Sequence, residues 1–331
     1  MSGSAKNPDL HAALRSTGFR GLLRDRPIVP LMGLLVALTA VIYLARPEMV
    51  TSNWAINIVR QAIPLSLLAA CQTITFLTGG IDLSVGAVAS MTGFLVATLV
   101  SRTGLPAALA IALVAGCLAG LITGIGVGVF RVHPLIMTLG MSLIVLGLAN
   151  VWQRIMVQTG AGVPAQLRWL GTETLAGFIP ASMLVWLPIM LLLLFMLSRT
   201  GYGRLLYAIG DNPVASRLSG ARSWQVIVVL YVLSALIAGV AGFLYAGLTN
   251  VANVNLVDPY VLPSVAAAVI GGTSIMGGRG GIGGTILGAL ILTVLGSLLS
   301  SLGFPEATRQ ILFGAIVVLM AAAYTRFTGE S

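Results

Sequence analysis

Long apolar runs recur along the whole chain and limit its fold more than any other feature. Each run holds about 20 residues, which as a helix crosses the roughly 30 Å hydrocarbon core of a bilayer. Hydrophobic residues make up 57% of the 331 residues and charged residues only 8%, too few to coat a soluble globule of this size. Backbone amides in lipid must be satisfied within their own segment, so helices are expected. The sequence predicts an all-α, polytopic membrane protein with ten spans, at about 28–46, 56–78, 82–101, 105–130, 134–153, 180–198, 224–248, 260–277, 282–302 and 307–325.

The positive charges predict the orientation of these spans. With the N-terminus inside, twelve of the eighteen Lys and Arg residues fall on the inner side and at most six on the outer side. Both termini are therefore expected in the cytoplasm, with tails at 1–27 and 327–331 around a transmembrane domain at 28–326. The net charge of +9 is scattered at the ends of apolar runs, so a nucleic-acid partner is not expected.

One polar stretch interrupts the apolar runs on the inner side. It reads SRTGYGRLLYAIGDNPVASRLSGARSW, residues 198–224. A short helix is expected within it, because Asp211 or Asn212 can cap a helix, Pro213 suits its first position and Gly220 suits its end. From the residues alone, this helix is either inert loop structure or a contact for a cytoplasmic partner.

The sequence lacks the motifs of several enzyme classes. A phosphate-binding loop needs a lysine after its glycines, and the only lysine is Lys6, in the tail. The two histidines, His11 and His133, lie in the tail and at an inner turn, and no nucleophile in a span has a base nearby in the sequence. No paired acidic motif or zinc spacing occurs either. These observations argue against a catalytic residue, a metal site and a membrane-embedded lipid-processing enzyme.

Glycines recur every four residues in two of the apolar runs. This spacing aligns them on one helix face, where the backbone of a neighbouring helix can approach closely. Helix packing within the chain is the favoured interpretation, and a dimer seam is the second. The glycines concerned are Gly116, Gly120, Gly124, Gly128, Gly284 and Gly288.

The stretch TFLTGGIDLSVGAVAS, residues 75–90, places a carboxylate between two spans. Asp82 can cap the following helix at the positive end of its dipole, where a charge costs less than in mid-membrane. A similar break, GGTSIMGGRGGIGG, carries Arg279, so the two charges either meet and help to close an inner gate, within or across subunits, or serve separate helix ends. The predicted pathway or gate residues are Gln72, Thr75, Gly79, Gly80, Asp82, Ser84 and Arg279.

Three motifs in order, TGGIDLSVGAV, GRLLYAIGDNPVASRLSG and AAAVIGGTSIMGGRGGIGGTILGAL, resemble the permease subunits of bacterial ABC sugar importers, in the ribose permease group of the ribose and branched-chain amino-acid permease superfamily. The resemblance covers about 28–325. It implies a multi-pass permease of the type II-like importer class in the bacterial inner membrane, surrounded by lipid. It also implies three partners: a second permease subunit, identical or sister; a cytoplasmic ATPase that binds ATP and magnesium; and a periplasmic sugar-binding protein. No cofactor is expected in this chain.

The same resemblance places an ATPase-coupling loop at 199–223. The broader importer pattern begins Glu-Ala-Ala before its glycine, and Asn212, Ala215 and Ser216 depart from it, so the individual contacts of the loop are not determined. A permease for a nucleoside or a sugar-derived autoinducer and an ion-coupled secondary transporter are the alternatives, and nothing in the sequence identifies the sugar. The predicted coupling residues are Gly210, Asp211, Asn212, Pro213, Ala215, Ser216, Arg217, Leu218, Ser219 and Gly220.

Overall fold

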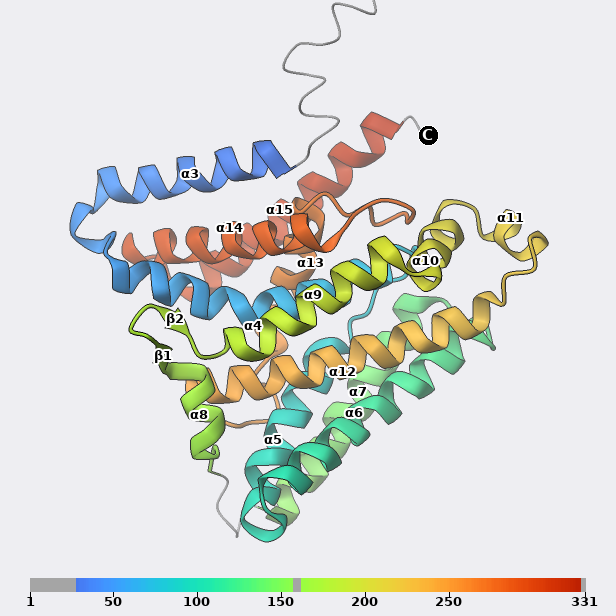
Figure 1. Cartoon of the computed structure of the whole chain (residues 1–331), viewed down its shortest axis with the longest axis horizontal. Coiled ribbons are helices and arrows are strands. Elements are labelled where there is room, and N and C mark those ends of the chain that lie inside the picture. The colour runs from blue at the N-terminus through green and yellow to red at the C-terminus, as the bar shows by residue number, and fades with distance from the viewer. Residues whose placement is uncertain (1–27, 157–161, 329–331) are drawn as a thin grey trace, which may run out of the picture.

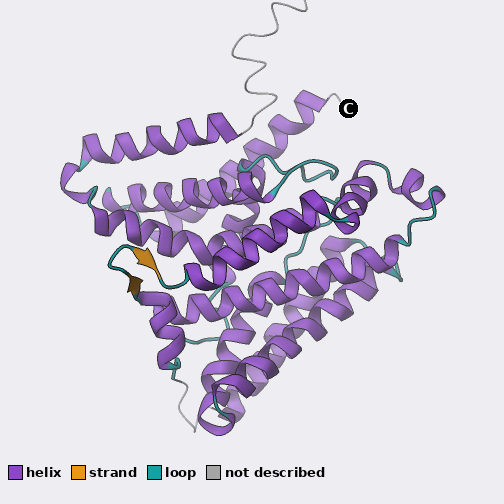
Figure 2. Ribbon diagram, viewed as in Figure 1, coloured by secondary structure: helices purple, strands orange, loops and turns teal. Residues whose placement is uncertain are grey.

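The computed structural model describes residues 28–156 and 162–328, and almost all of them are helical (Figure 2). The predicted N-terminal tail at 1–27 and the last three residues of the predicted C-terminal tail lie outside the described residues. The elements are α3 (Ile28–Ala45), η1 (Pro47–Met49), α4 (Ser52–Phe76), α5 (Val85–Thr103), α6 (Leu105–Gly128), α7 (Pro134–Met156), α8 (Ala165–Thr172), β1 (Thr174–Leu175), β2 (Ile179–Pro180), α9 (Met183–Arg199), α10 (Gly201–Asp211), α11 (Pro213–Leu218), α12 (Ser223–Thr249), η3 (Asp258–Tyr260), α13 (Val261–Ile270), α14 (Ile282–Ser301) and α15 (Glu306–Thr328).

Every predicted apolar run contains a helix, and nine of the ten are helical over most of their length, which confirms the all-α, polytopic fold class. Within the described residues, seven helices are long and apolar enough to cross a membrane; α9 and α10, bent by 68°, make eight if they count as one span. The prediction of a complete span at about 260–277 is wrong. Helix α13 has ten residues and rises about 15 Å, half of the hydrocarbon core. The glycine-rich segment that follows it, from Gly271, forms a loop.

Local signals in the sequence explain where several helices begin and end. The Thr51 hydroxyl accepts a hydrogen bond from the backbone N–H of Trp54 (3.2 Å) and caps the start of α4. Gly104, with φ of +76°, separates α5 from α6. Asn250 ends α12 in the left-handed conformation, which asparagine tolerates better than most residues.

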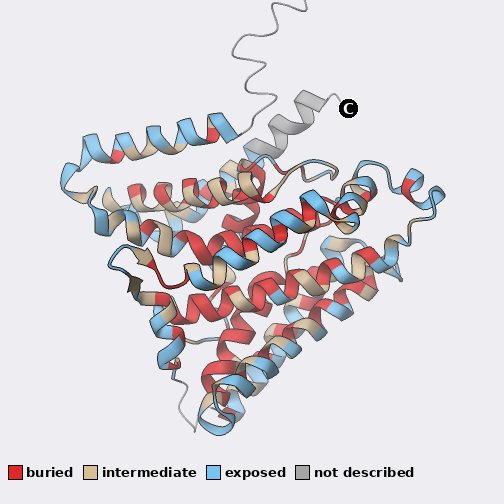
Figure 3. Cartoon of the chain, viewed as in Figure 1, coloured by how far each residue is buried: buried red, intermediate tan, exposed pale blue. Residues whose placement is uncertain are grey.

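Helix α12 lies at the centre of the packing. It contacts α4, α5, α6 and α8, and most of its residues are buried (Figure 3). Helix α3 is exposed along most of its length although its sequence is strongly apolar. An apolar helix that is exposed in the isolated chain fits a lipid environment.

The glycine stripe of α6 packs against the backbone of α12. A Cβ atom at Gly120 would lie 2.5 Å from the carbonyl oxygen of Tyr231, and one at Gly124 would lie 2.8 Å from the Cα of Val228. Gly284 approaches the carbonyl oxygen of Gly271 in the same way, between α14 and α13. These contacts confirm the packing interpretation of the glycine pattern.

The loops gather at two opposite ends of the molecule (Figure 1). Helices α10 and α11 lie at one end, on the right of the view. The turn between α3 and α4 and the short antiparallel hairpin of β1 and β2 lie at the other. The predicted inner and outer loops therefore separate in space as the alternation of spans requires. That the α11 end faces the cytoplasm stays a prediction.

We expect Gly120→Ala to weaken the contact between α6 and α12. The added methyl group would meet a backbone carbonyl that cannot rotate away, and overpacking of this kind costs about 1–3 kcal/mol. The midpoint of thermal unfolding in nanodiscs should fall. Gly147→Ala on α7 is the matched control, because nothing lies within 4 Å of its Cβ position and alanine favours helix. An equal fall in both variants would contradict the interpretation.

Candidate functional site at the Asp82 break

The break between α4 and α5 is organised around Asp82. Gly79 turns the chain after α4 with φ of +74°. One carboxylate oxygen, Oδ1 of Asp82, accepts hydrogen bonds from the backbone N–H of Ser84 (3.0 Å) and from its hydroxyl (2.6 Å), and α5 begins at Val85. The predicted bond from the Ser84 N–H to Asp82 is confirmed, but Ser84 is the N-cap residue of α5 and no side chain bonds to the first turn of the helix, so Asp82 closes the turn that precedes α5 and does not cap the helix itself.

The rest of Asp82 is satisfied by groups from other helices. Its side chain is 2% exposed, and its second oxygen, Oδ2, accepts a hydrogen bond from the hydroxyl of Ser234 on α12 (2.8 Å). The amide Nε2 of Gln72 on α4 donates to the Asp82 carbonyl (2.8 Å). A buried carboxylate is tolerated when hydrogen-bond donors replace the water that it loses. Here the donors to the carboxylate are the N–H and hydroxyl of Ser84 and the hydroxyl of Ser234. Asp82 therefore ties α4, α5 and α12 together.

Sequence reasoning missed Ser234. The available signal was a single serine in the apolar run of α12, since a polar residue in a membrane helix commonly faces a partner inside the protein. The sequence did not indicate which residue it would face.

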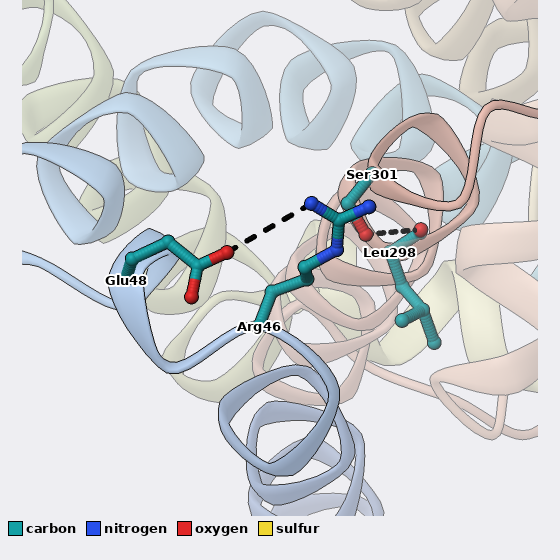
Figure 4. Close-up of polar contacts among 4 residues, drawn as sticks. All are labelled: Arg46, Glu48, Leu298 and Ser301. Atoms are coloured by element: carbon teal, nitrogen blue, oxygen red, sulfur yellow. Dashed lines mark hydrogen bonds and ion pairs between the residues drawn. The ribbon is translucent and has the colours of Figure 1, made fainter.

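Of the two arrangements considered for Asp82 and Arg279, the ion pair does not form within the subunit. Arg279 lies exposed in the loop between α13 and α14, where its carbonyl accepts a hydrogen bond from Ser274 N–H (2.9 Å). In the described part of the chain the ion pairs are Arg46–Glu48 (3.8 Å, Figure 4) and Arg309–Glu306. The two carboxylate oxygens of Asp82 bond to Ser84 and Ser234, not to an arginine. A contact between Asp82 and Arg279 across subunits stays a prediction.

The other predicted pathway residues lie inside the helix packing of the single chain. Gln72 and Thr75 are both 0% exposed. The Thr75 hydroxyl donates to carbonyls of its own helix at Cys71 and Gln72 (both 3.0 Å), so it presents no free donor. Gly80 packs closely against Tyr231, whose hydroxyl would lie 2.9 Å from a Cβ atom at that position.

The predicted coupling loop forms α10 and α11, and its caps are those expected. The side-chain oxygen of Asn212 accepts hydrogen bonds from the backbone N–H groups of Val214 (3.0 Å) and Ala215 (2.9 Å), and Pro213 occupies the first turn of α11. Gly220 follows the helix with φ of +82°. Bonds from Gly220 N–H to the Arg217 carbonyl (3.0 Å) and from Ala221 N–H to the Ser216 carbonyl (3.1 Å) complete a Schellman motif.

Helix α11 presents apolar side chains at the surface. Leu218 is 84% exposed and Val214 57% exposed, one helical turn apart, whereas Ser216 is buried. Arg217 folds back so that its Nε donates to the Pro213 carbonyl (3.1 Å). The end of the molecule thus carries a small, well-capped helix with two exposed apolar side chains.

Three backbone segments meet where the predicted coupling loop joins the body of the protein. We call this contact the glycine junction. It is formed by Leu77, Gly210, Gly277 and Gly278. Gly278 N–H donates to the Leu77 carbonyl (3.1 Å). A Cβ atom at Gly210 would lie 1.8 Å from the Leu77 carbonyl oxygen and 2.5 Å from the Gly278 nitrogen. The end of α10 therefore touches both glycine-rich breaks through backbone atoms alone. The sequence located the breaks, but it did not indicate that the end of α10 contacts both of them.

No group of three or more His, Cys, Asp or Glu side chains that could hold a metal ion occurs among residues 28–156 and 162–328. The arrangement instead links a surface helix to a buried polar break in the helix packing.

Comparison with known proteins identifies the family. Residues 54–321 match the family described as branched-chain amino acid transport system / permease component. The chain belongs to this permease family. It is a multi-pass membrane permease subunit and not an ATPase, as the sequence indicated.

Named relatives cover most of the chain. The ribose import permease protein RbsC of Escherichia coli (strain K12) is 36% identical over 290 residues, 87% of this chain and 90% of the relative. The fructose import permease protein FrcC of Rhizobium meliloti is 32% identical, over 89% of this chain and 84% of the relative. The galactofuranose transporter permease protein YtfT of Escherichia coli (strain K12) is 34% identical, over 80% and 77%. No solved structure shows a significant match to this permease.

We expect Ser234→Ala to destabilise the permease by about 1–3 kcal/mol, because it removes a donor from a buried charged acceptor. The measurement is the thermal unfolding midpoint in nanodiscs. Thr123→Val is the control: it removes a buried hydroxyl that bonds only to the Ala119 carbonyl of its own helix (2.9 Å). If the two variants lose the same stability, Ser234 does not serve Asp82.

Proposed function

We propose that this permease is the membrane subunit of an ATP-driven importer that carries a monosaccharide, ribose-like or another simple sugar, across the bacterial inner membrane. Its family and the sugars in the names of its relatives support this proposal. The observation that carries the mechanism is the glycine junction, where the predicted coupling loop touches the Asp82 break through backbone contacts.

The junction gives a direct route for mechanical coupling. A separate ATPase chain, which holds ATP and magnesium, would engage α11 through Val214 and Leu218. Motion of α11 would pass to the end of α10, because Asn212 joins the two helices directly. Gly210 would then move Leu77 and the break that follows it, since no side chain lies between these backbones to absorb the displacement. The break carries Asp82, which is bonded to α12.

The remaining partners follow from the same proposal. A second permease subunit, identical or sister, would complete the translocation path, and a periplasmic binding protein would deliver the sugar at the end opposite to α11. The path would open alternately to the two sides as the coupling helices move. A permease for a nucleoside or a sugar-derived autoinducer would keep this machinery and differ only in what is delivered. An ion-coupled transporter would not need an ATPase at α11.

The decisive experiment is recovery of the ATPase with tagged permease from native membranes. We expect Leu218→Asp to reduce that recovery about tenfold, because a charge replaces an apolar side chain that the ATPase would bury. Phe178→Asp is the control, an apolar residue 63% exposed at the opposite end. A wild-type assembly that contains no ATPase and still transports on an ion gradient would refute the proposal.

The glycine junction is tested separately. In Gly210→Ala the added methyl group would push α10 away from Leu77 and Gly278, so we expect the ATPase to stay bound while ATP-driven uptake falls at least tenfold. Gly201→Ala at the other end of α10 is the control, because its Cβ position meets only the flexible Arg204 side chain at 3.7 Å. Normal uptake in Gly210→Ala would remove the junction from the mechanism.

A further inference from the structure

A groove of about 680 Å³ lies beside the loop between α13 and α14. It is lined by residues of this loop, of α9 and α10, and of the first turns of α3 and α14. Leu194 and Arg279 are among the lining residues and are exposed, so the groove is open to the surroundings of the protein. No residue of the Asp82 network or of the glycine junction lines it.

The ends of three apolar helices set the depth of the groove in the membrane. Ile28 is the first residue of α3, Ile282 is the first of α14, and Ser198 is the last but one of α9. Charged residues follow at once, since Arg199 ends α9 and Arg279 lies in the loop before α14. These helix ends point towards the end of the molecule that carries α11 (Figure 1). The groove therefore lies where the hydrocarbon core meets the lipid headgroups.

The wall of the groove has an apolar part and a polar part. Leu194 and Leu197 of α9, together with Ile28, supply apolar side chains from the spans. Tyr207 and Arg279 supply polar groups from α10 and the loop. A ligand that matches both parts carries an apolar chain next to a polar headgroup, which is the structure of a phospholipid. A free inorganic anion has no apolar portion to cover the leucines.

The charge of the wall selects among phospholipids. Arg279 is the charged residue among the described residues that line the groove. Its guanidinium forms no ion pair with any described residue, although Asp211 packs against the neighbouring Gly278. Arg199 adds a second positive charge at the end of α9. Arginine binds phosphate through charge-assisted hydrogen bonds, so the groove favours a headgroup of net negative charge over a zwitterionic one.

The groove also borders the predicted coupling segment. The Tyr207 hydroxyl on α10 donates to the carbonyl of Gly280 (2.9 Å), the residue after Arg279. The Arg279 carbonyl accepts a hydrogen bond from Ser274 N–H (2.9 Å) across the same loop. A ligand held by Arg279 and by α9 would therefore fix this loop in place. Because the unfolded chain has no such groove, the ligand should stabilise the folded protein.

We infer that the groove is a binding site for one anionic phospholipid from the leaflet on the α11 side. The lipid phosphate bonds to the Arg279 guanidinium, and an acyl chain lies against Leu194 and Leu197. The bound lipid holds the loop between α13 and α14 against α10. This inference goes beyond the proposed function, because it requires only that the chain spans a membrane.

The test compares thermal unfolding of the purified full chain in two kinds of nanodisc with the same acyl chains. One kind contains phosphatidylcholine alone, and the other also contains phosphatidylglycerol, which is anionic. We expect phosphatidylglycerol to raise the unfolding midpoint by about 3 °C. Inorganic phosphate added to the phosphatidylcholine nanodiscs should give no such rise, because it has no acyl chain. An equal rise with inorganic phosphate would overturn the lipid as the ligand.

Charge variants test the role of Arg279. Arg279→Gln should reduce the rise to about 1 °C or less, whereas Arg279→Lys keeps the positive charge and should retain most of the rise. Arg222→Gln is the matched control, since Arg222 is an exposed arginine at the start of α12 that does not line the groove. It should keep the wild-type rise. Each rise is measured against the same variant in phosphatidylcholine, so a change in intrinsic stability cancels.

Two further variants test whether the lipid lies in the groove. Leu194→Trp places a large ring in the groove and should reduce the rise as much as Arg279→Gln does, although Arg279 is still present. Leu191→Trp is the matched control, because Leu191 is an exposed apolar residue of the same helix that does not line the groove. It should keep the wild-type rise.

The outcomes decide between a specific site and a general effect of lipid charge. A rise lost in both Arg279→Gln and Leu194→Trp and kept in both controls would support the site. No rise in the wild type, an unchanged rise in either groove variant, or an equal loss in the controls would overturn it. None of these measurements depends on transport, so the result holds for the site even if the native assembly contains no ATPase and the proposed function fails.

Discussion

Backbone contact between helices is the interaction on which the rest of this permease depends. In a bilayer, lipid tails are as apolar as leucine, so burial of apolar side chains contributes little free energy to the association of helices. Small residues allow the close approach that dispersion forces require. Glycines bring α6 against α12 and α14 against α13, and Gly210 brings α10 against the end of α4. Close backbone contact thus builds the body of the protein and attaches α10, which leads into the predicted coupling helix α11.

The Asp82 network adds a polar element to this packing. A carboxylate taken out of water is costly unless its oxygens are bonded, and here donors from Ser84 and Ser234 satisfy both oxygens. Because the donors come from two elements, the bonds hold α5 and α12 in one relative position. A displacement of the break between α4 and α5 would be transmitted to α12 directly, through the bond between Asp82 and Ser234. Helix α12 in turn packs against α4, α5, α6 and α8.

The two ends of the molecule have different chemical character. One end carries the exposed apolar side chains of α11 above the glycine junction, which suits the docking of a protein that exerts force. The other end carries the ring pair of Tyr245 and Tyr260 and the ion pair of Glu306 and Arg309. Helices α4 and α12 run towards that end and also bond to Asp82, through Gln72 and Ser234, so they connect it with the break between α4 and α5.

The sequence by itself determined the features that depend on neighbouring residues. Apolar runs located the helices, and the residues Asn212, Pro213 and Gly220 located α11. The bond from the Ser84 N–H to Asp82 and the packing face of the glycines were also predicted. Each of these follows from interactions within a few residues or from helical periodicity. The short length of α13 was not predicted, because the sequence after Ile270 stays mostly apolar although it forms a loop. Several glycines of this loop have positive φ, which ends the helix. Only the tertiary structure decided that Asp82 meets Ser234 and not Arg279, and that Gly210 touches Leu77 and Gly278. These contacts join residues far apart in the chain, and which residues meet depends on how whole helices pack against one another.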